Sequence, residues 1–176
     1  MGLGLKRSTV ELFDHDPEWE TLADKTIALL WSIFRSTAKD IQHVGSTAIR
    51  HIKAKPIIDI VIGVQNFESL SEIWPLLVSN GICKPTDQPF SDMIVCSIND
   101  REKDTRLYNL QIAVIGSKAW TNHINFRDFM NAYPEKARIY ESIKIELAKR
   151  YPNDLDRYAN GKEEFITECL NEAKLL

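Results

Sequence analysis

Hydrophobic and polar residues recur with two different periods along the chain, and these periods separate helices from strands. An apolar stripe at helical spacing follows Asp16-Pro17, which favours a helix with Asp16 as its N-cap and Pro17 in its first turn. Helical spacing also predicts a helix over residues 68–78, with a kink at Pro75. Three more helices are predicted in the C-terminal third, over residues 121–131, 134–151 and 161–175.

Short apolar segments predict the strands of a sheet. Residues 57–64 are apolar almost throughout, so we expect this strand in the centre of the sheet, covered on both faces. The other predicted strands are residues 10–13, 41–44, 82–84 and a hairpin of 93–98 and 106–115, joined by the charged link 99–104. A small mixed sheet flanked by helices, with a helical C-terminal third, is an α+β fold. Without a linker or repeat, the 176 residues predict one domain over residues 1–176.

Composition narrows the classes of function. A hydrophobic content of 44% excludes a disordered chain. The net charge of -3 argues against a protein that coats extended nucleic acid, because phosphate binding needs a basic face. No apolar run approaches the ~20 residues of a membrane span, and no signal-peptide core precedes the first charges. The three cysteines lack metal-binding spacing and are expected to be buried free thiols, so we predict a cytoplasmic protein.

One charged residue interrupts the central apolar strand. Asp59 lies in the middle of residues 57–62, where a carboxylate costs roughly several kcal/mol unless a cation or hydrogen-bond donor meets it. Shortly before it, Gly45, Ser46 and Thr47 offer backbone N–H groups and two hydroxyls. An anion-binding turn that faces a carboxylate able to hold a metal suits nucleotidyl transfer.

Two motifs carry a family resemblance: HVGSTA at residues 43–48 and KPIIDI at residues 55–60. Both resemble the GrpB family of small bacterial proteins, which is placed in the nucleotidyltransferase superfamily. Weaker matches are Asp16 to Trp19, Phe126 to Asp128, Tyr140, Lys144, Ala148, Tyr158, Lys162 and Phe165. The resemblance covers nearly the whole chain and implies the superfamily's mixed-sheet fold. It also implies that Asp59 is the catalytic and metal-binding residue, with Mg²⁺ or Mn²⁺ as its cofactor.

The chain departs from the superfamily pattern at the positions of the acids. Val61 stands where the second carboxylate of the pair is expected, and the later strand carries Asn109 and Gln111 in place of a third. Two further departures are Gln42, where relatives tend to have an acid, and Arg50-His51, where they tend to have Pro-Gly. These departures weaken the expectation of catalysis more than the expectation of the fold.

Each candidate residue also has a purely structural interpretation. The turn 45–47 would either cradle a triphosphate or simply connect a strand to a helical turn with Ser46 or Thr47 as N-cap. Asp59 would hold a cation or pair with a basic residue or a backbone donor. His43 would bind phosphate, act as a base, or satisfy a hydrogen bond in the core. Four basic residues would line an anion pocket or form surface ion pairs: Lys55, Arg127, Lys144 and Lys162.

Three hypotheses for the function follow. The first is a nucleotidyltransferase that binds phosphates through residues 45–47, holds magnesium at Asp59, and neutralises charge with Lys55 and Arg127. The second is a catalytically degenerate module that binds a nucleotide or another phosphorylated small molecule, which the missing acid at Val61 motivates. The third is an adaptor whose C-terminal helices dock a protein partner.

Overall fold

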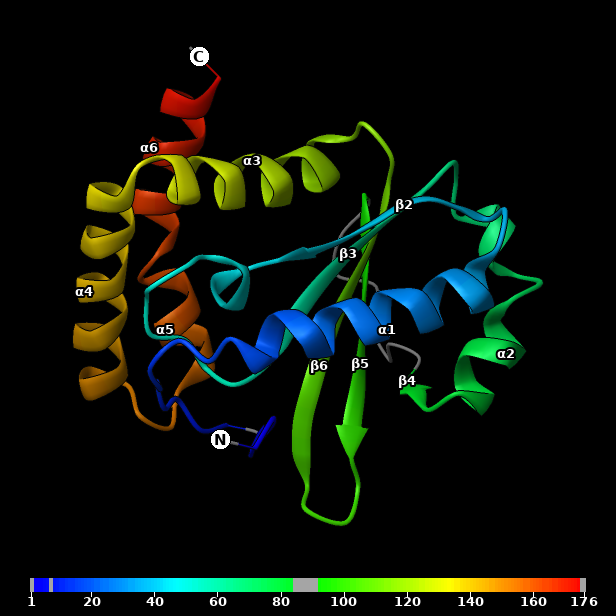
Figure 1. The fold of residues 1–176 in the computed structure, drawn as a ribbon, viewed down its shortest axis with the longest axis horizontal. Coiled ribbons are helices and arrows are strands. Elements are labelled where there is room, and N and C mark those ends of the chain that lie inside the picture. The colour runs from blue at the N-terminus through cyan, green and yellow to red at the C-terminus, as the bar shows by residue number, and fades with distance from the viewer. Residues whose placement is uncertain (1, 7, 84–91, 175–176) are drawn as a thin grey trace.

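The computed structural model describes residues 2–6, 8–83 and 92–174. A mixed sheet of six strands forms the centre, in the order β2-β3-β6-β5-β4, with β1 paired to β6 (Figure 1). Among the described strands, β3 and β6 are parallel and the other pairings are antiparallel. The strands are β1 (Leu5–Lys6), β2 (Ala38–Val44), β3 (Ile58–Val64), β4 (Ile82–Cys83), β5 (Met93–Asp100) and β6 (Thr105–Val114).

Helices cover the sheet and gather beyond one end of it (Figure 1). The described helices are α1 (Glu18–Phe34), α2 (Trp74–Ser79), α3 (Lys118–Ala132), α4 (Pro134–Arg150), α5 (Leu155–Asn160) and α6 (Glu163–Ala173). The described residues also form two short 3₁₀ helices, η1 (Ser46–Ala48) and η2 (Glu68–Leu70). This arrangement confirms the predicted α+β fold with a helical C-terminal third. None of the described helices has the length and hydrophobicity needed to span a bilayer.

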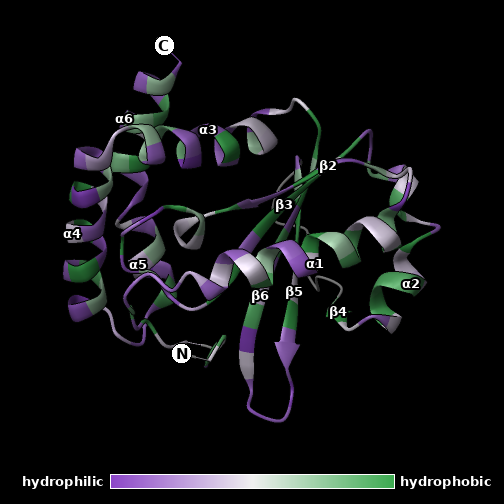
Figure 2. Cartoon of the chain, in the orientation of Figure 1, coloured by the Kyte–Doolittle hydropathy of each residue, from purple (hydrophilic) through white to green (hydrophobic). Residues whose placement is uncertain are grey.

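Two hydrophobic cores hold these elements together. In the first, α1 packs Trp19, Leu30 and Phe34 against the sheet, and all three are fully buried. In the second, Ile49 and Ile52, which follow η1, pack against aromatic side chains of the C-terminal helices, such as Phe126. Figure 2 shows hydrophobic residues along the central strands and a hydrophilic hairpin loop between β5 and β6. The turn after β2 lies where the two cores meet.

Some predicted elements differ from the structure. The strand over residues 10–13 is wrong. Phe13 forms an isolated β-bridge to Ala54, and the Val10 N–H donates to the Pro152 carbonyl at 2.8 Å, but the segment forms no strand. The kinked helix over 68–78 is also wrong. It is replaced by η2 and α2, and Pro75 lies in the first turn of α2, where its missing N–H is not needed.

The ends of several elements differ by a few residues from those predicted. The N-cap of α1 is Pro17, not Asp16 as predicted, and the helix begins at Glu18. Asp16 Oδ1 still accepts a hydrogen bond from the Glu18 N–H at 3.0 Å. The predicted hairpin forms, but its first strand extends to Asp100, and its second strand runs from Thr105 to Val114, one residue earlier than predicted. The helix over 161–175 begins at Glu163, and the short α5 precedes it without having been predicted. Lys84 and Leu175, the last residues of two predicted elements, lie outside the described residues.

Candidate functional site

Asp59 lies on the central strand β3 and is held by two side chains of β6. The parallel register places Asp59 beside Asn109 and Val61 beside Gln111. Asp59 Oδ1 accepts hydrogen bonds from Asn109 Nδ2 at 2.9 Å and from Gln111 Nε2 at 3.3 Å. The two amides therefore satisfy the carboxylate that the sequence placed inside an apolar strand.

Gly45 packs directly against the other oxygen of the carboxylate. It follows β2 with a φ of +71°, a conformation that side chains rarely adopt. A Cβ at this position would lie only 2.4 Å from Asp59 Oδ2. The antiparallel pairing of Val44 with Asp59 brings the two segments together. Glycine is thus required at position 45 both for its backbone conformation and for space.

A cavity of about 390 Å³ opens beside Asp59. It lies between the turn after β2, the sheet, and the helices α3, α4 and α6. Its walls are part polar and part apolar, formed by Gly45, Ser46, Asp59, Met93, Gln111, Ala119, Asn122, His123, Phe126, Tyr140, Lys162, Ile166 and Leu170. We call it the Asp59 cavity. Three predicted site residues besides Asp59 line it: Gly45, Ser46 and Lys162.

Two lysines supply positive charge near Asp59. The ammonium groups of Lys162 and Lys55 lie 4.4 Å and 5.4 Å from the centre of the Tyr158 ring. Burial lowers the pKa of Lys162 to about 8; Lys55 lowers it further, whereas Asp59 opposes the shift. Burial also lowers the pKa of Lys55, again against the attraction of Asp59. Two half-buried cations beside one carboxylate leave an excess of positive charge, which favours an anionic ligand.

Neutral hydrogen-bonding groups complete the walls of the Asp59 cavity. Burial raises the pKa of Tyr140 to about 12, although its hydrogen bond with Ser46 lowers it. Tyr140 therefore keeps its proton at neutral pH. Burial lowers the pKa of His123, while Asp59 acts in the opposite direction. The sequence did not single out His123, because a lone histidine on a helix carries no local signal of a site.

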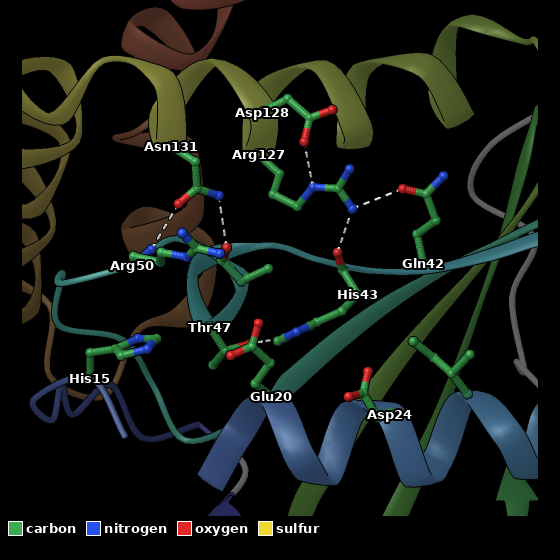
Figure 3. A pocket seen from close by; sticks show the side chains of 12 residues that line it. His15, Glu20, Asp24, Gln42, His43, Thr47, Arg50, Arg127, Asp128 and Asn131 are labelled. Carbon is green, nitrogen blue, oxygen red and sulfur yellow. Dashed lines mark hydrogen bonds and ion pairs between the residues drawn. The ribbon is translucent and has the colours of Figure 1, made fainter. Parts of the chain in front are cut away.

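Three of the other predicted residues line a second cavity (Figure 3). This cavity measures about 490 Å³, and His43, Thr47 and Arg127 are in its walls. Arg127 Nη1 donates to Gln42 Oε1 at 2.8 Å and to the His43 carbonyl at 2.9 Å. Its Nε donates to Asp128 at 2.8 Å. Arg127 therefore joins α3 to β2 and is not part of the walls of the Asp59 cavity.

His43 is engaged within the protein as well. Its Nε2 lies 2.9 Å from Thr47 Oγ1. Burial lowers the pKa of His43 to about 4, with Asp59 raising it and Arg127 lowering it. The imidazole is thus neutral at physiological pH. This geometry agrees with the structural interpretation of His43, a hydrogen-bonded residue of the β2 edge.

The side chains around Asp59 do not fit a two-metal centre. Such a centre needs several oxygen ligands that bridge two ions roughly 4 Å apart. Val61 supplies none, and both β6 amides direct donors, not acceptors, at Asp59 Oδ1. Across the described part of the chain, no three His, Cys, Asp or Glu side chains group in a way that could hold a metal ion.

Solved structures with similar folds support the architecture. A GrpB protein from Enterococcus faecalis superposes with a TM-score of 0.83 at 23% identity, covering 93% of this chain and 96% of that one. The Cid1 poly(U) polymerase with bound MgGTP superposes with a TM-score of 0.55 at 12% identity, covering 78% of this chain and 44% of the polymerase. The fold is therefore nucleotidyltransferase-like.

Sequence comparison identifies the family. The glutamate-rich protein GrpB of Alkalihalophilus pseudofirmus is 37% identical, over 97% of this chain and 99% of its own length. The UPF0157 protein YqkA of Bacillus subtilis is 28% identical, but this chain spans only 47% of it. A dephospho-CoA kinase of Mycolicibacterium paratuberculosis is 24% identical, and the chain again spans 47% of it. Residues 9–172 match the GrpB protein family, to which this chain belongs.

Proposed function

We propose that this protein binds a nucleoside triphosphate or another phosphorylated small molecule in the Asp59 cavity. The observation that carries the proposal is a pair of half-buried lysines, Lys55 and Lys162, which share the Tyr158 ring. Lys162 lines the cavity together with the turn that contains Gly45 and Ser46. The lysines provide charge for a phosphate group. The turn provides a close backbone approach and a hydroxyl.

The shape of the cavity suits the rest of such a ligand. Phe126, Ile166 and Leu170 form an apolar wall, whereas Asn122 and His123 place polar groups within the same walls. Ligand sites commonly combine mostly apolar walls with a few placed polar groups. A phosphate near Lys162 would therefore leave its organic portion against α3 and α6.

Thermal melting tests this proposal directly. The panel is ATP, GTP, CTP, UTP and dephospho-CoA, the last because of the kinase relatives. A ligand at 100 times its Kd stabilises the folded state by about 2.7 kcal/mol, a shift of several degrees. We expect at least one compound to raise the Tm of the wild type. If no phosphorylated compound does so, the proposal is wrong.

Two lysine substitutions, one at the Asp59 cavity and one on the surface, provide the matched comparison. Lys162→Met removes the charge but keeps an unbranched stem against Tyr158, and we expect it to lose most of the ligand-induced shift. Lys149→Met removes a charge from an exposed surface ion pair and is expected to keep the shift. Equal shifts in both variants would place the ligand elsewhere.

Nucleotidyl transfer with Mg²⁺ or Mn²⁺ is the second candidate. It is favoured by the fold shared with the Cid1 poly(U) polymerase and by the presence of Asp59 on the central strand. It is disfavoured by the donor set around Asp59, which does not fit two ions. The test is pyrophosphate release from the four nucleoside triphosphates over a panel of acceptors, with Asp59→Asn as the control. Release that depends on Asp59 would establish the transfer reaction.

A further inference from the structure

The two carboxylate oxygens of Asp59 have different neighbours, and this difference matters for cation binding. Oδ1 faces two N–H donors, from Asn109 and Gln111, and Oδ2 faces Gly45. Gln111 is only 9% exposed, and its Oε1 finds no hydrogen-bond partner among the described residues. The amide therefore uses its donor for the carboxylate and keeps its acceptor oxygen free.

A divalent cation and these amide donors compete for the same side of the carboxylate. A magnesium ion at Oδ1 would approach the partly positive hydrogens of two N–H groups. It would also have to displace two hydrogen bonds to a charged acceptor, which are stronger than those between neutral groups. Turning the amides over would direct their oxygens at the ion, but would leave Asp59 without donors whenever the ion is absent.

We propose that Asn109 and Gln111 replace the metal ions of this fold, holding Asp59 as an internal hydrogen-bond acceptor that takes no divalent cation. Phosphate charge is then met by Lys55 and Lys162 instead of by magnesium, a step that rests on the proposed function. Asp59 balances the two lysines when no ligand is present, because its negative charge acts on both of them.

Mn²⁺ alone tests the metal half of this inference. We expect millimolar Mn²⁺ to leave the Tm of the wild type unchanged, and paramagnetic resonance to detect no ion whose binding depends on Asp59. Asn109→Asp places a second carboxylate beside the first, so we expect a lower Tm in EDTA and a recovery of several degrees in Mn²⁺. Gln111→Glu is the alternative if that variant does not fold. Asn153→Asp adds the same charge at an exposed position and is expected to show neither effect.

Thermal melting with nucleotides in EDTA tests the second half of the inference, which is that the lysines bind phosphate without a metal ion. A wild-type shift with a phosphorylated compound that persists in EDTA supports lysine-based binding. Mn²⁺ stabilisation of the wild type that Asp59→Asn abolishes would overturn the inference and leave the proposed binding function intact. A nucleotide shift that vanishes in EDTA would overturn it as well. The absence of any shift, with or without metal, would refute the proposed function, while the Mn²⁺ experiment would still decide whether Asp59 takes a metal.

Discussion

Gly45 and Asp59 define the site at the scale of single residues. The glycine has a positive φ and its Cα lies against the carboxylate, so any side chain at position 45 meets both strain and overlap. Gly116 also has a positive φ, +76°, but a Cβ added there would meet open space. It therefore shows what a side chain costs at a positive φ without a close contact.

Gly45→Ala is expected to destabilise the fold by more than Gly116→Ala. Both glycines have a positive φ, and Gly45 combines it with a ψ of −169°, a backbone region essentially confined to glycine that costs a side chain roughly 1–3 kcal/mol. Only at position 45 does the added methyl also lie 2.4 Å from Asp59 Oδ2, which must then move away from the β6 amides. Urea denaturation of both variants measures the difference. Equal losses of unfolding free energy would mean that the contact with Asp59 relaxes without cost.

The residue scale also shows where sequence-based prediction succeeds and fails. Periodicity predicted the central strand and the long helices, because these depend on local hydrophobic spacing. It did not separate Ser46 from Thr47, which line different cavities. Successive residues of a 3₁₀ helix such as η1 point about 120° apart, so neighbours in one motif diverge. The amide partners of Asp59 lie 50 and 52 residues away, and no local pattern predicts that pairing.

Two basic side chains join elements that are far apart in sequence. Arg127 joins α3 to the outer edge of β2, where the His43 carbonyl accepts its hydrogen bond. Lys144 of α4 is fully buried, donates to the Lys53 carbonyl and lies 4.9 Å from the Tyr140 ring centre. Both hold the turn after β2 against the C-terminal helices. Resemblance drew attention to both residues, but their roles here are in positioning the site.

Arg127→Met is expected to lower the free energy of unfolding by about 2 kcal/mol. It leaves the His43 carbonyl and the Gln42 amide oxygen without their charged donor, and such bonds are worth about 1.5–3 kcal/mol each before relaxation. Chemical denaturation measures the loss. Arg138→Met removes an exposed arginine of α4 and should change stability little. A similar small effect for Arg127 would mean that water replaces the guanidinium readily.

Lys144 should make stability depend on pH. Burial lowers its pKa to about 7, with Lys162 lowering it further, Glu141 raising it and Lys55 lowering it. In the unfolded chain the pKa returns to 10.5. The buried charge therefore destabilises the fold fully below pH 7, and this penalty declines as the pH rises toward 10.5, because the unfolded chain then holds the extra proton.

Lys144→Met removes this pH dependence. The difference in unfolding free energy between the wild type and the variant should shift in favour of the wild type from pH 7 to pH 10, with a slope of at most about 1.4 kcal/mol per pH unit. Denaturation curves at several pH values measure it. Lys149→Met, which alters an exposed lysine, should run parallel to the wild type. If the unfolding free energy of Lys144→Met also runs parallel to that of the wild type across this pH range, the pKa of Lys144 is not lowered in the folded state.

At the scale of the whole molecule, the Asp59 cavity lies between the two hydrophobic cores. One wall belongs to the sheet and the turn after β2, and the other to the helices α3, α4 and α6. A ligand in the cavity contacts both sides at once. It should therefore tie the C-terminal helices to the sheet and suppress their separate opening.

Hydrogen exchange measured with and without a bound nucleotide tests this expectation. Amides of residues 45–48 and of α6 should exchange more slowly in the complex, whereas those of the hydrophilic loop 101–104 should not change. Protection centred instead on residues 20–27 of α1 would place the nucleotide in the cavity that contains His43. The experiment thus distinguishes the two cavities without a substitution.

The parallel pairing of β3 with β6 determines when the site can form during folding. Parallel strands cannot be joined by a tight turn, and the residues that meet at Asp59 are separated by 50 positions. Hairpins and helices can form from local contacts, but this pairing must first close a long loop at an entropic cost. The site is therefore absent from partly folded chains. A ligand that binds it acts only on molecules whose sheet is complete, and so reports the end of folding rather than its progress.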